Sequence, residues 1–388
     1  MAEIAVVHNT LDLRGGADAV CLHACEALGA AHDVTLLTLS HPPLETLDDL
    51  FDTAAAPVTS VETPPFGQQL GGVFAAAAPH VGPQLPLRSV LLDRWLRRRR
   101  AAFDLVVSTA NEFAVPGRSL QYVHFPQFRA AATTTTMTAS DEPQRDVGGL
   151  TDRLWTRLAG LGDGRLPSGA RVLANSSYTA NEVTRRYGRE PAVLHPPVDP
   201  IEGGPTWEER DEGVVILGRI APDKRTLRAL SVVDGVRETG HDLTVHVVGT
   251  AAPAYRAYAE RVVDAVAERP YATLHRDASR DRLEELLTTT KYGLSAKPGE
   301  HFGMAVAEYV AAGMVAFAPD SGGQRDVLDG DDDRLFGSVA EAVDLLAAAV
   351  ERDDRPRRPR DRFARERFHE RLRAETRAQL SPEATRPP

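Results

Sequence analysis

Two glutamates with seven residues between them stand in the segment AKPGEHFGMAVAEYVAAG, residues 296–313. Glu300 lies in a glycine-containing loop after an apolar strand pattern, and Glu308 lies about one and a half turns inside the following helix. A carboxylate so placed can accept two hydrogen bonds from the vicinal hydroxyls of a ribose, while loop N–H groups and the helix N-terminus face an anion. The helix is otherwise apolar and small, so Glu308 should be buried and needs a partner. The alternative is that Glu308 pairs with one of the many arginines.

The segment LGRIAPDKR, residues 217–225, places two cations behind another strand pattern. Arg219 follows the strand end, and Lys224 lies five residues later at the start of a helix. Two fixed cations there could clamp a pyrophosphate and offset the charge of a departing diphosphate. Of 45 Lys and Arg residues only three are lysine, the others being Lys291 and Lys297, so Lys224 is less readily explained as a solvated surface residue.

Four weaker features also follow strand patterns. Gly15-Gly16 and Ser321-Gly322-Gly323 allow close backbone approach to a phosphate or sugar. His124, in YVHFPQ, is either a structural histidine or a residue at the mouth of a ligand site. Asn175-Ser176-Ser177 could bind a sugar or cap the next helix.

The elements that must position these residues form two series of apolar strands and amphipathic helices. The strands of the first series are EIAVVHN, HDVTLLTL, FDLVVSTAN, SLQYVHF and RVLANSS, and those of the second are GVVILGRI, DLTVHVVGT, YATLHRD, YGLSAKP and MVAFAP. Continuous apolar strands separated by helices indicate parallel sheets covered on both faces. We therefore expect an α/β protein with two doubly wound, Rossmann-like domains whose strand ends face a central cleft.

The Pro-, Gly- and charge-rich stretch 196–212 is predicted to be the linker. The expected domains are 1–198, 199–354, and a C-terminal helix and tail at 355–388. Phe363, Phe368 and Leu372 fall near one face of that helix, which should pack back on the body of the protein.

Two segments depart from the alternating pattern. Residues 130–150 show little periodicity and are predicted to form a loop or lid. LLDRWLRRRR, residues 91–100, is either an interfacial patch for anionic lipid headgroups or the basic C-terminal end of a helix.

Composition excludes several classes of protein. With 388 residues, 42% hydrophobic and 26% charged, the chain is neither disordered nor built around a membrane-spanning helix. The net charge of -10 argues against nucleic-acid binding. No signal peptide is expected, so the predicted location is cytoplasmic. Cys21 and Cys25, four apart on one helix, make neither a disulfide framework nor a metal site.

Gly15-Gly16, LGRIAPDK and GEHFGMAVAEYVAAG with SGG downstream together resemble the retaining, GT-B-fold glycosyltransferases of family four. The resemblance covers nearly the whole chain and the motifs occur in the family's order. YVHFPQ, ANSSYT and HPPVD are most similar to the mannosyltransferases that extend lipid-linked oligosaccharides. Many family members carry a small residue in place of Lys297.

The resemblance implies a nucleotide-diphosphate sugar held mainly by 199–354 and an acceptor held by 1–198. Glu308 would bind the ribose, Glu300 the donor sugar, and Arg219 and Lys224 the diphosphate, with His124 near the transferred sugar. The implied catalytic residues are His124, Glu300, Arg219 and Lys224. The implied donor-binding residues are Gly15, Gly16, Arg219, Lys224, Glu300, His301, Phe302, Gly303, Met304 and Glu308.

In this family the anomeric configuration is retained without an established protein nucleophile. The acceptor attacks from the leaving-group face, and a donor phosphate oxygen takes its proton. The resemblance implies no metal ion and no cofactor besides the donor, with GDP-mannose expected first and UDP-sugars second. The acceptor would be a glycan or glycolipid, including a lipid-linked oligosaccharide, and residues 91–100 would bring the protein to the inner membrane face.

Two alternatives belong to other functional classes. A nucleotide-sugar epimerase or a Rossmann oxidoreductase could use similar domains, but RGGADA lacks the G-x-G-x-x-G pattern of the oxidoreductase. A non-catalytic nucleotide-sugar-binding protein would keep the fold and lose turnover.

Overall fold

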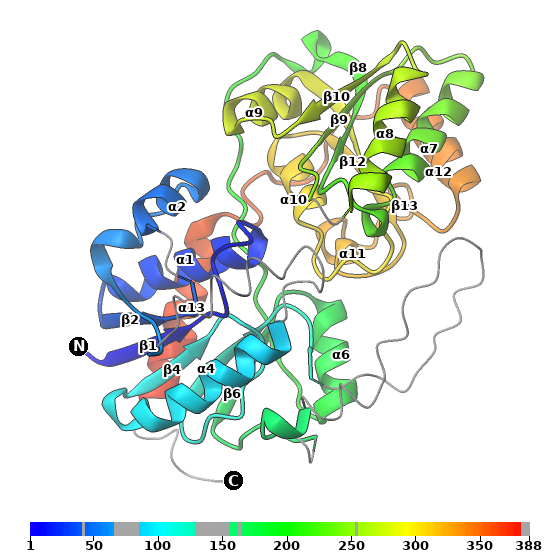
Figure 1. Ribbon diagram of the computed structural model, residues 1–388. Coiled ribbons are helices and arrows are strands. Elements are labelled where there is room, and N and C mark those ends of the chain that lie inside the picture. The colour runs from blue at the N-terminus through cyan, green and yellow to red at the C-terminus, as the bar shows by residue number, and fades with distance from the viewer. Residues whose placement is uncertain (41–42, 66–84, 129–155, 162–163, 253–254, 382–388) are drawn as a thin grey trace. The chain divides into compact units, whose positions relative to one another are not determined.

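The computed structural model describes residues 1–40, 43–65, 85–128, 156–161, 164–252 and 255–381. The chain divides into two compact units, and the red helix at the C-terminus in Figure 1 belongs mostly to the same unit as the blue N-terminal segment. Unit 1 comprises residues 1–195 together with 368–388, and unit 2 comprises residues 196–367. The predicted loop or lid at 130–150 lies outside the described residues.

Unit 1 is built on a seven-stranded sheet in which every pairing is parallel, in the order β3-β2-β1-β4-β5-β6-β7. Its strands are β1 (Glu3–Val7), β2 (Asp33–Leu37), β3 (Thr59–Glu62), β4 (Leu105–Ser108), β5 (Ser119–Val123), β6 (Ala170–Ala174) and β7 (Ala192–Val193). Its helices are α1 (Gly16–Gly29), α2 (Leu44–Phe51), α4 (Leu85–Arg99), α6 (Ser177–Tyr187) and most of α13 (Arg365–Leu380).

Unit 2 is built on a six-stranded parallel sheet in the order β10-β9-β8-β11-β12-β13. Its strands are β8 (Asp211–Leu217), β9 (Thr244–Gly249), β10 (Ala272–Arg276), β11 (Thr290–Leu294), β12 (Val315–Pro319) and β13 (Leu335–Phe336). Its helices are α7 (Thr226–Glu238), α8 (Arg256–Ala267), α9 (Arg280–Thr289), α10 (Met304–Ala311), α11 (Gln324–Val327) and α12 (Val339–Glu351).

The central strands are buried because helices cover both faces of each sheet. All five residues of β11 and of β12 are buried, and residues 4–7 of β1 are inaccessible to solvent. Such strands have no solvent-facing side, which is why most of their residues are apolar and the buried Lys291 of β11 is paired with Glu212 and Asp353. The predicted doubly wound α/β architecture is therefore confirmed in both units.

The predicted linker at 196–212 packs on unit 2. Val198 and Ile201 belong to one of its apolar clusters, and Val198 N–H donates to the Phe363 carbonyl at 2.7 Å. The chain passes from unit 1 to unit 2 after His195, at the start of the predicted linker. Apolar residues within a stretch rich in Pro and Gly provide a packing surface that the composition did not reveal.

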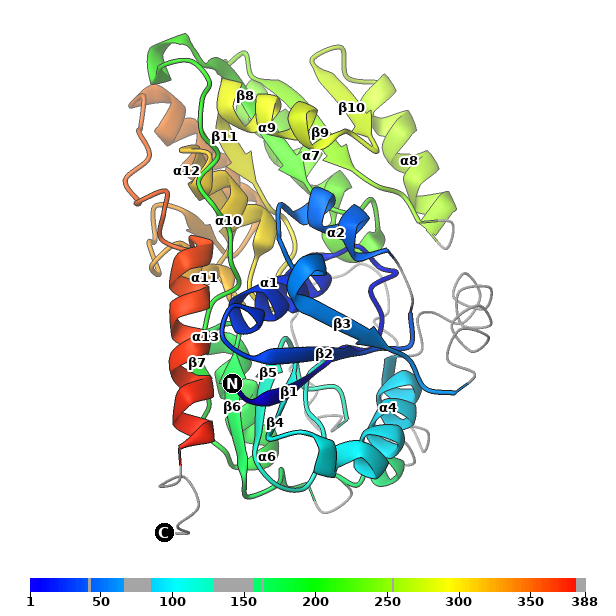
Figure 2. The same ribbon diagram turned by 90° about the vertical axis from the view of Figure 1, so that its left-hand side faces the viewer.

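The tail after residue 355 is divided between the two units. Phe363 lies before α13 and packs edge to face on Phe302 of unit 2, so the prediction that it shares the helix face was wrong. Phe368 and Leu372 do share that face, and both are buried in a unit 1 cluster. α13 lies beside α1 in Figure 2, as predicted for a helix that packs back.

Cys21 and Cys25 are both buried on α1 and form no disulfide, as expected. Within the described ranges, every helix is too short or too polar to cross a lipid bilayer.

Candidate active site

A pocket opens in unit 2 where β8 and β11 end. Its walls include Gly218, which follows β8, Ser295, which follows β11, and Gly303 at the start of α10. Lys224 and Glu300 also line it, so with Gly303 three of the predicted site residues lie at the same pocket. Because carboxyl ends of neighbouring parallel strands meet at one sheet edge, segments far apart in sequence converge here.

Charged side chains form a continuous series of contacts at this pocket. Lys224 Nζ donates a hydrogen bond to Glu300 Oε1, and Lys297 Nζ lies 3.6 Å from Glu300 Oε2. Lys297 also donates to Asp223 Oδ2 at 3.1 Å. Arg219 reaches the same Asp223 oxygen at 3.5 Å. We call these five residues the cation cluster.

The cation cluster holds three positive charges against two carboxylates, which leaves one net positive charge. Burial of Glu300, whose side chain is 16% exposed, raises its pKa, but the charges of Lys224 and Lys297 outweigh burial and hold the pKa below its usual value. The pKa of Asp223 is likewise lowered, since Lys297 and Arg219 more than offset its burial. Both carboxylates are therefore ionised, and an anionic ligand would find cations that are only partly neutralised.

Ser321-Gly322-Gly323 supports the Glu300 loop. Gly322 has φ of +79°, and a side chain there would overlap the backbone of Glu300. Gly323 N–H donates to the Glu300 carbonyl at 2.7 Å, and Gly299 N–H donates to Ser321 Oγ at 3.0 Å. The backbone that approaches these glycines closely is the protein's own, so this motif fixes the Glu300 loop.

The first turn of α10 faces the same pocket. Gly303, with φ of +108°, occupies the N-cap position and offers no side chain to the first N–H groups of the helix, and Ala305 and Val306 line the pocket with it. The Phe302 side chain is buried in the unit 2 core, so any contact of Phe302 with a ligand would come from its backbone. His301 is only partly buried in the loop before the helix.

Glu308 lies in the second turn of α10, with its side chain 20% exposed. Arg280 of α9 places Nη1 3.8 Å from Glu308 Oε1 and also pairs with Glu284 at 2.5 Å. Burial, together with the charge of Glu284, raises the pKa of Glu308 despite the opposing charge of Arg280. The arginine pairing considered from the sequence thus exists, but Arg280 is shared between two acids.

Sequence reasoning missed Tyr309, which fixes α10 against the strand ends. Its hydroxyl accepts a hydrogen bond from Leu217 N–H at 2.8 Å and lies 3.4 Å from the Leu294 carbonyl. The ring packs directly over Gly293, where any side chain would overlap it. A glycine inside the strand pattern YGLSAKP was the available signal of such a close approach.

In unit 1, Gly15 and Gly16 lie between β1 and α1, with Gly15 at the helix N-cap. A methyl group in place of a Gly15 hydrogen would meet nothing within 4 Å, so space is open beside this loop. Asp18 accepts a hydrogen bond from Gly15 N–H at 3.3 Å and a second from His8 Nε2 at 3.0 Å. The other His8 ring nitrogen donates to the Thr109 carbonyl at 3.1 Å.

His8 Nδ1 also lies 3.0 Å from Thr109 Oγ1, and the Asp18 carboxylate beside Nε2 favours the protonated ring. Burial lowers the pKa of His8, but the neighbouring Cys21 and the Asp18 carboxylate outweigh burial and raise that pKa to about 9. This buried ion pair holds the glycine loop. Sequence patterns do not reveal it, because His8 simply continues an apolar strand.

His124 follows β5, where its backbone N–H donates to Asn111 Oδ1 at 2.7 Å. Its Nε2 donates to the Thr109 carbonyl at 3.1 Å, and its ring meets Tyr122 edge to face. These contacts support the structural interpretation of His124 and fix its ring. Its contact with a transferred sugar stays a prediction.

Ser176 caps α6 by accepting from Thr179 N–H at 3.1 Å, so the capping interpretation of Asn175-Ser176-Ser177 is confirmed.

Most arginines at the end of α4 contact other groups of the protein. Arg97 pairs with Asp93 at 2.7 Å, Arg99 pairs with Glu62 at 2.8 Å, and Arg100 donates to backbone carbonyls. These contacts favour the helix-end interpretation of residues 91–100.

Two family models match the chain. The model for Glycosyltransferase Family 4 matches residues 14–202, and the model for Glycosyl transferases group 1 matches residues 200–365. Together they extend over most of both units.

The curated relatives are GDP-Man:Man(3)GlcNAc(2)-PP-Dol alpha-1,2-mannosyltransferases. The chain is 27% identical to that of Candida glabrata over 167 residues, which is 39% of this chain and 33% of that protein. It is 25% identical to that of Mus musculus over 196 residues, which is 46% of this chain and 40% of that protein. The matches therefore span less than half the length of these relatives.

Solved structures share the fold. Anabaena Alr3699/HepE in complex with UDP and glucose gives a TM-score of 0.66 at 14% identity, covering 97% of this chain and all of that one. WaaG, a glycosyltransferase involved in lipopolysaccharide biosynthesis, gives 0.60 at 14% identity, covering 98% of both chains. With two matching family models on two doubly wound sheets, the chain belongs to the GT-B-fold glycosyltransferases, with a Family 4 domain followed by a group 1 domain.

Proposed function

We propose that this protein is a retaining hexosyltransferase, which moves a hexose of mannose or glucose type from a nucleotide-diphosphate sugar to a hydroxyl acceptor. The observation that carries the proposal is the cation cluster at the unit 2 pocket, where Lys224 and Lys297 meet Glu300. An excess of cations over carboxylates in a half-buried pocket suits a diphosphate group, and the ionised Glu300 can accept only from hydroxyl or N–H donors.

The reaction breaks the bond between the anomeric carbon and the diphosphate oxygen and forms a bond from that carbon to the acceptor oxygen. The electron pair of the broken bond stays on the diphosphate, and the acceptor proton passes to one of its oxygens. Arg219 and Lys224 stabilise the negative charge that develops on this leaving group. Retention follows when the acceptor approaches from the face that the diphosphate leaves.

Glu300 and Glu308 bind different parts of the donor. Glu300 accepts hydrogen bonds from sugar hydroxyls, exchanging its contact with Lys224 for them as Lys224 turns to the diphosphate. Glu308 accepts from the two ribose hydroxyls, with Arg280 restraining its carboxylate. The uncapped N–H groups at the start of α10 add partial positive charge for the phosphates.

GDP-mannose is the first donor to test, since the curated relatives are named for GDP-Man, and UDP-glucose is the second, since HepE is solved with it. A lipid-linked oligosaccharide is the corresponding acceptor, bound by unit 1. Such an acceptor would bring residues 91–100 to a membrane surface, where Arg94 and Arg98 are exposed.

The test is a screen of nucleotide sugars for protection against thermal unfolding, because a ligand that binds the native state alone raises the melting temperature. Each protecting donor is then incubated with glycan and glycolipid acceptors, and products are identified by mass spectrometry and the anomeric configuration by NMR. A transferred hexose with retained configuration supports the proposal. Binding without turnover would identify a non-catalytic binding protein, and conversion of the donor sugar itself would identify an epimerase.

A further inference from the structure

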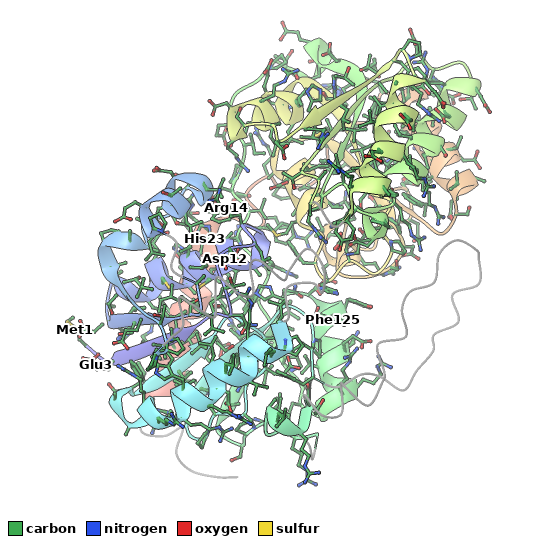
Figure 3. All side chains as sticks on the ribbon, in the orientation of Figure 1. Met1, Glu3, Asp12, Arg14, His23 and Phe125 are labelled. Carbon is green, nitrogen blue, oxygen red and sulfur yellow. The ribbon has the colours of Figure 1, made fainter. Side chains whose placement is uncertain are left out.

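Two histidines and a glutamate meet where α1 and α13 pack together in unit 1. His23 and Glu26 lie three residues apart on one face of α1, and His369 lies on α13 (Figure 3 labels His23). One ligand atom from each side chain falls within 4.8 Å of the others. Among the described residues, this is the one group of three His, Cys, Asp or Glu side chains with that geometry.

We propose that these three residues bind a divalent transition-metal ion of the Zn²⁺ class, which links the C-terminal helix α13 to α1. Two imidazoles and one carboxylate form a donor set that Zn²⁺ accepts in proteins, with water as the fourth ligand. The proposal is independent of glycosyl transfer, and it places a metal where the sequence predicted none.

The spacing of the nitrogen atoms fits such an ion. His23 Nδ1 and His369 Nε2 are 3.3 Å apart. Ligand nitrogens at about 2.0 Å from a tetrahedral Zn²⁺ are about 3.3 Å from each other, so the two rings already span one edge of the coordination shell. Glu26 Oε2 lies 3.9 Å from His23 Nδ1, which a small rotation of the carboxylate would shorten.

The Glu26 carboxylate is the second observation that points to a cation. Its Oε2 atom is shielded from solvent, and in the described part of the structure it accepts no hydrogen bond. A buried carboxylate oxygen without a donor is unfavourable unless a cation is present. The last turn of α1 supplies no basic side chain, and the negative end of its helix dipole lies close by.

The surroundings allow both a stable site and entry of the ion. His23 and His369 are 5% and 7% exposed, whereas the Glu26 side chain is 25% exposed and so leaves a path to solvent. The packing around the site is apolar, since Phe368 and Leu372 of α13 belong to the same cluster as Leu22 and Leu28 of α1.

The bound ion would link His23 and His369, which are 346 residues apart in the sequence. Closing so long a loop restricts the unfolded chain, so the bound ion should raise the stability of unit 1. The helices are already joined by the bond from Arg373 Nε to the Ala27 carbonyl at 2.8 Å, which lets the site preform before the ion arrives.

The experiment uses the full-length chain without an affinity tag, stripped with a chelator and titrated with Co²⁺ and then Zn²⁺. We expect one equivalent of Co²⁺ to give the visible absorption bands of a four- or five-coordinate ion, and Zn²⁺ to displace it. Zn²⁺ should also raise the melting temperature of the stripped protein.

Two variants and a control assign the ligands. Glu26→Gln keeps the size of the side chain and removes its charge, and it should weaken Zn²⁺ binding at least about tenfold, because even the loss of an outer hydrogen-bond partner has that effect. His369→Gln should abolish binding at one equivalent. The matched control is His246→Gln, which removes one member of a pair of histidines 3.1 Å apart in unit 2 and should leave the binding unchanged.

The wild-type protein makes the test decisive even if a variant fails to fold. Absence of one-equivalent Co²⁺ bands from the stripped wild-type chain overturns the proposal and identifies the cluster as a metal-free hydrogen-bonded histidine pair. Binding that survives in a folded His369→Gln chain, or that is lost in His246→Gln, also overturns it.

Discussion

Lys224 donates a hydrogen bond to Glu300 across 76 residues of sequence, at the pocket where β8 and β11 end. Lys224, which we propose binds the diphosphate, and Glu300, which we propose binds the donor sugar, therefore contact each other. Under the proposed function, a donor would exchange this contact for two of its own, which would couple recognition of the phosphates to recognition of the sugar.

Lys224→Ala should lower kcat/KM for the nucleotide-sugar donor by about 10- to 100-fold. The estimate follows from the loss of one hydrogen bond to a charged group. The measurement is the initial rate of transfer at subsaturating donor. Arg256→Ala, which removes an arginine 85% exposed on α8, is the control and should retain full activity. An unchanged rate in Lys224→Ala would contradict the assigned clamp.

Glu300→Gln should impair sugar-dependent steps more than binding of the free nucleotide diphosphate. The substitution removes the negative charge that partly neutralises Lys224 and Lys297, so affinity for the free diphosphate should stay the same or rise. Transfer should fall about tenfold or more, since a neutral amide accepts weaker hydrogen bonds from the sugar. Calorimetric titration with the diphosphate and with the intact donor separates the two effects. Equal losses of affinity for both ligands would reject the role of Glu300.

Donor affinity should fall in mild acid because of Glu308. Burial raises the pKa of this carboxyl above its ordinary value of 4.5, so it takes up a proton at a higher pH than an exposed glutamate. The protonated form can no longer accept from both ribose hydroxyls. Binding measured by calorimetry should therefore weaken as pH falls through the raised pKa.

The matching variant is Glu308→Gln. It should bind the donor more weakly at neutral pH and should lose the acid-dependent decrease. A wild-type affinity that stays constant over that range, or a variant that follows the wild-type curve, would argue against Glu308 as the ribose ligand.

His8 should make unit 1 less stable in mild alkali. Its pKa is raised from 6.5 to about 9 in the folded protein, so its contribution is complete below pH 6.5 and is lost as pH rises toward 9. The full contribution corresponds to about 3 kcal/mol. Urea unfolding of the wild-type chain should show a steeper loss of stability over this range than that of His8→Gln.

Asp18→Asn tests one cause of the same shift. Without the carboxylate that accepts from His8 Nε2, the pKa of His8 should fall, and stability should decrease less steeply with pH than in the wild-type chain. If the free energy of unfolding depends on pH in the same way in the wild-type chain, His8→Gln and Asp18→Asn, His8 does not carry the charge assigned to it.

Much of the fold follows from local sequence patterns. β8, β9 and β12 each contain an apolar run that the sequence identifies as a strand: VVIL, VV and VAFAP. The two-residue strands β7 and β13 were not predicted, because two residues carry no periodicity. The packing of residues 196–201 on unit 2 depends on Phe363, which lies far along the chain.

The candidate site was predictable where its residues follow strand ends. Lys224 and Glu300 meet because parallel strands bring their carboxyl ends to one edge of the sheet. Residues that act through packing were not predictable in this way. Tyr309 and His8 are ordinary members of apolar segments in the sequence, and only tertiary contacts give them a polar partner.

The scarcity of lysine in this chain has a practical consequence for labelling experiments. The three lysines all lie in unit 2, and two of them meet at Glu300 while Lys291 is buried between Glu212 and Asp353. Apart from the exposed α-amino group of Met1, reagents that modify primary amines would therefore report mainly on the pocket. Isotope-labelled methyl groups attached to Lys224 and Lys297 would give an NMR spectrum of a few signals, in which occupancy by a phosphate-bearing compound could be read directly.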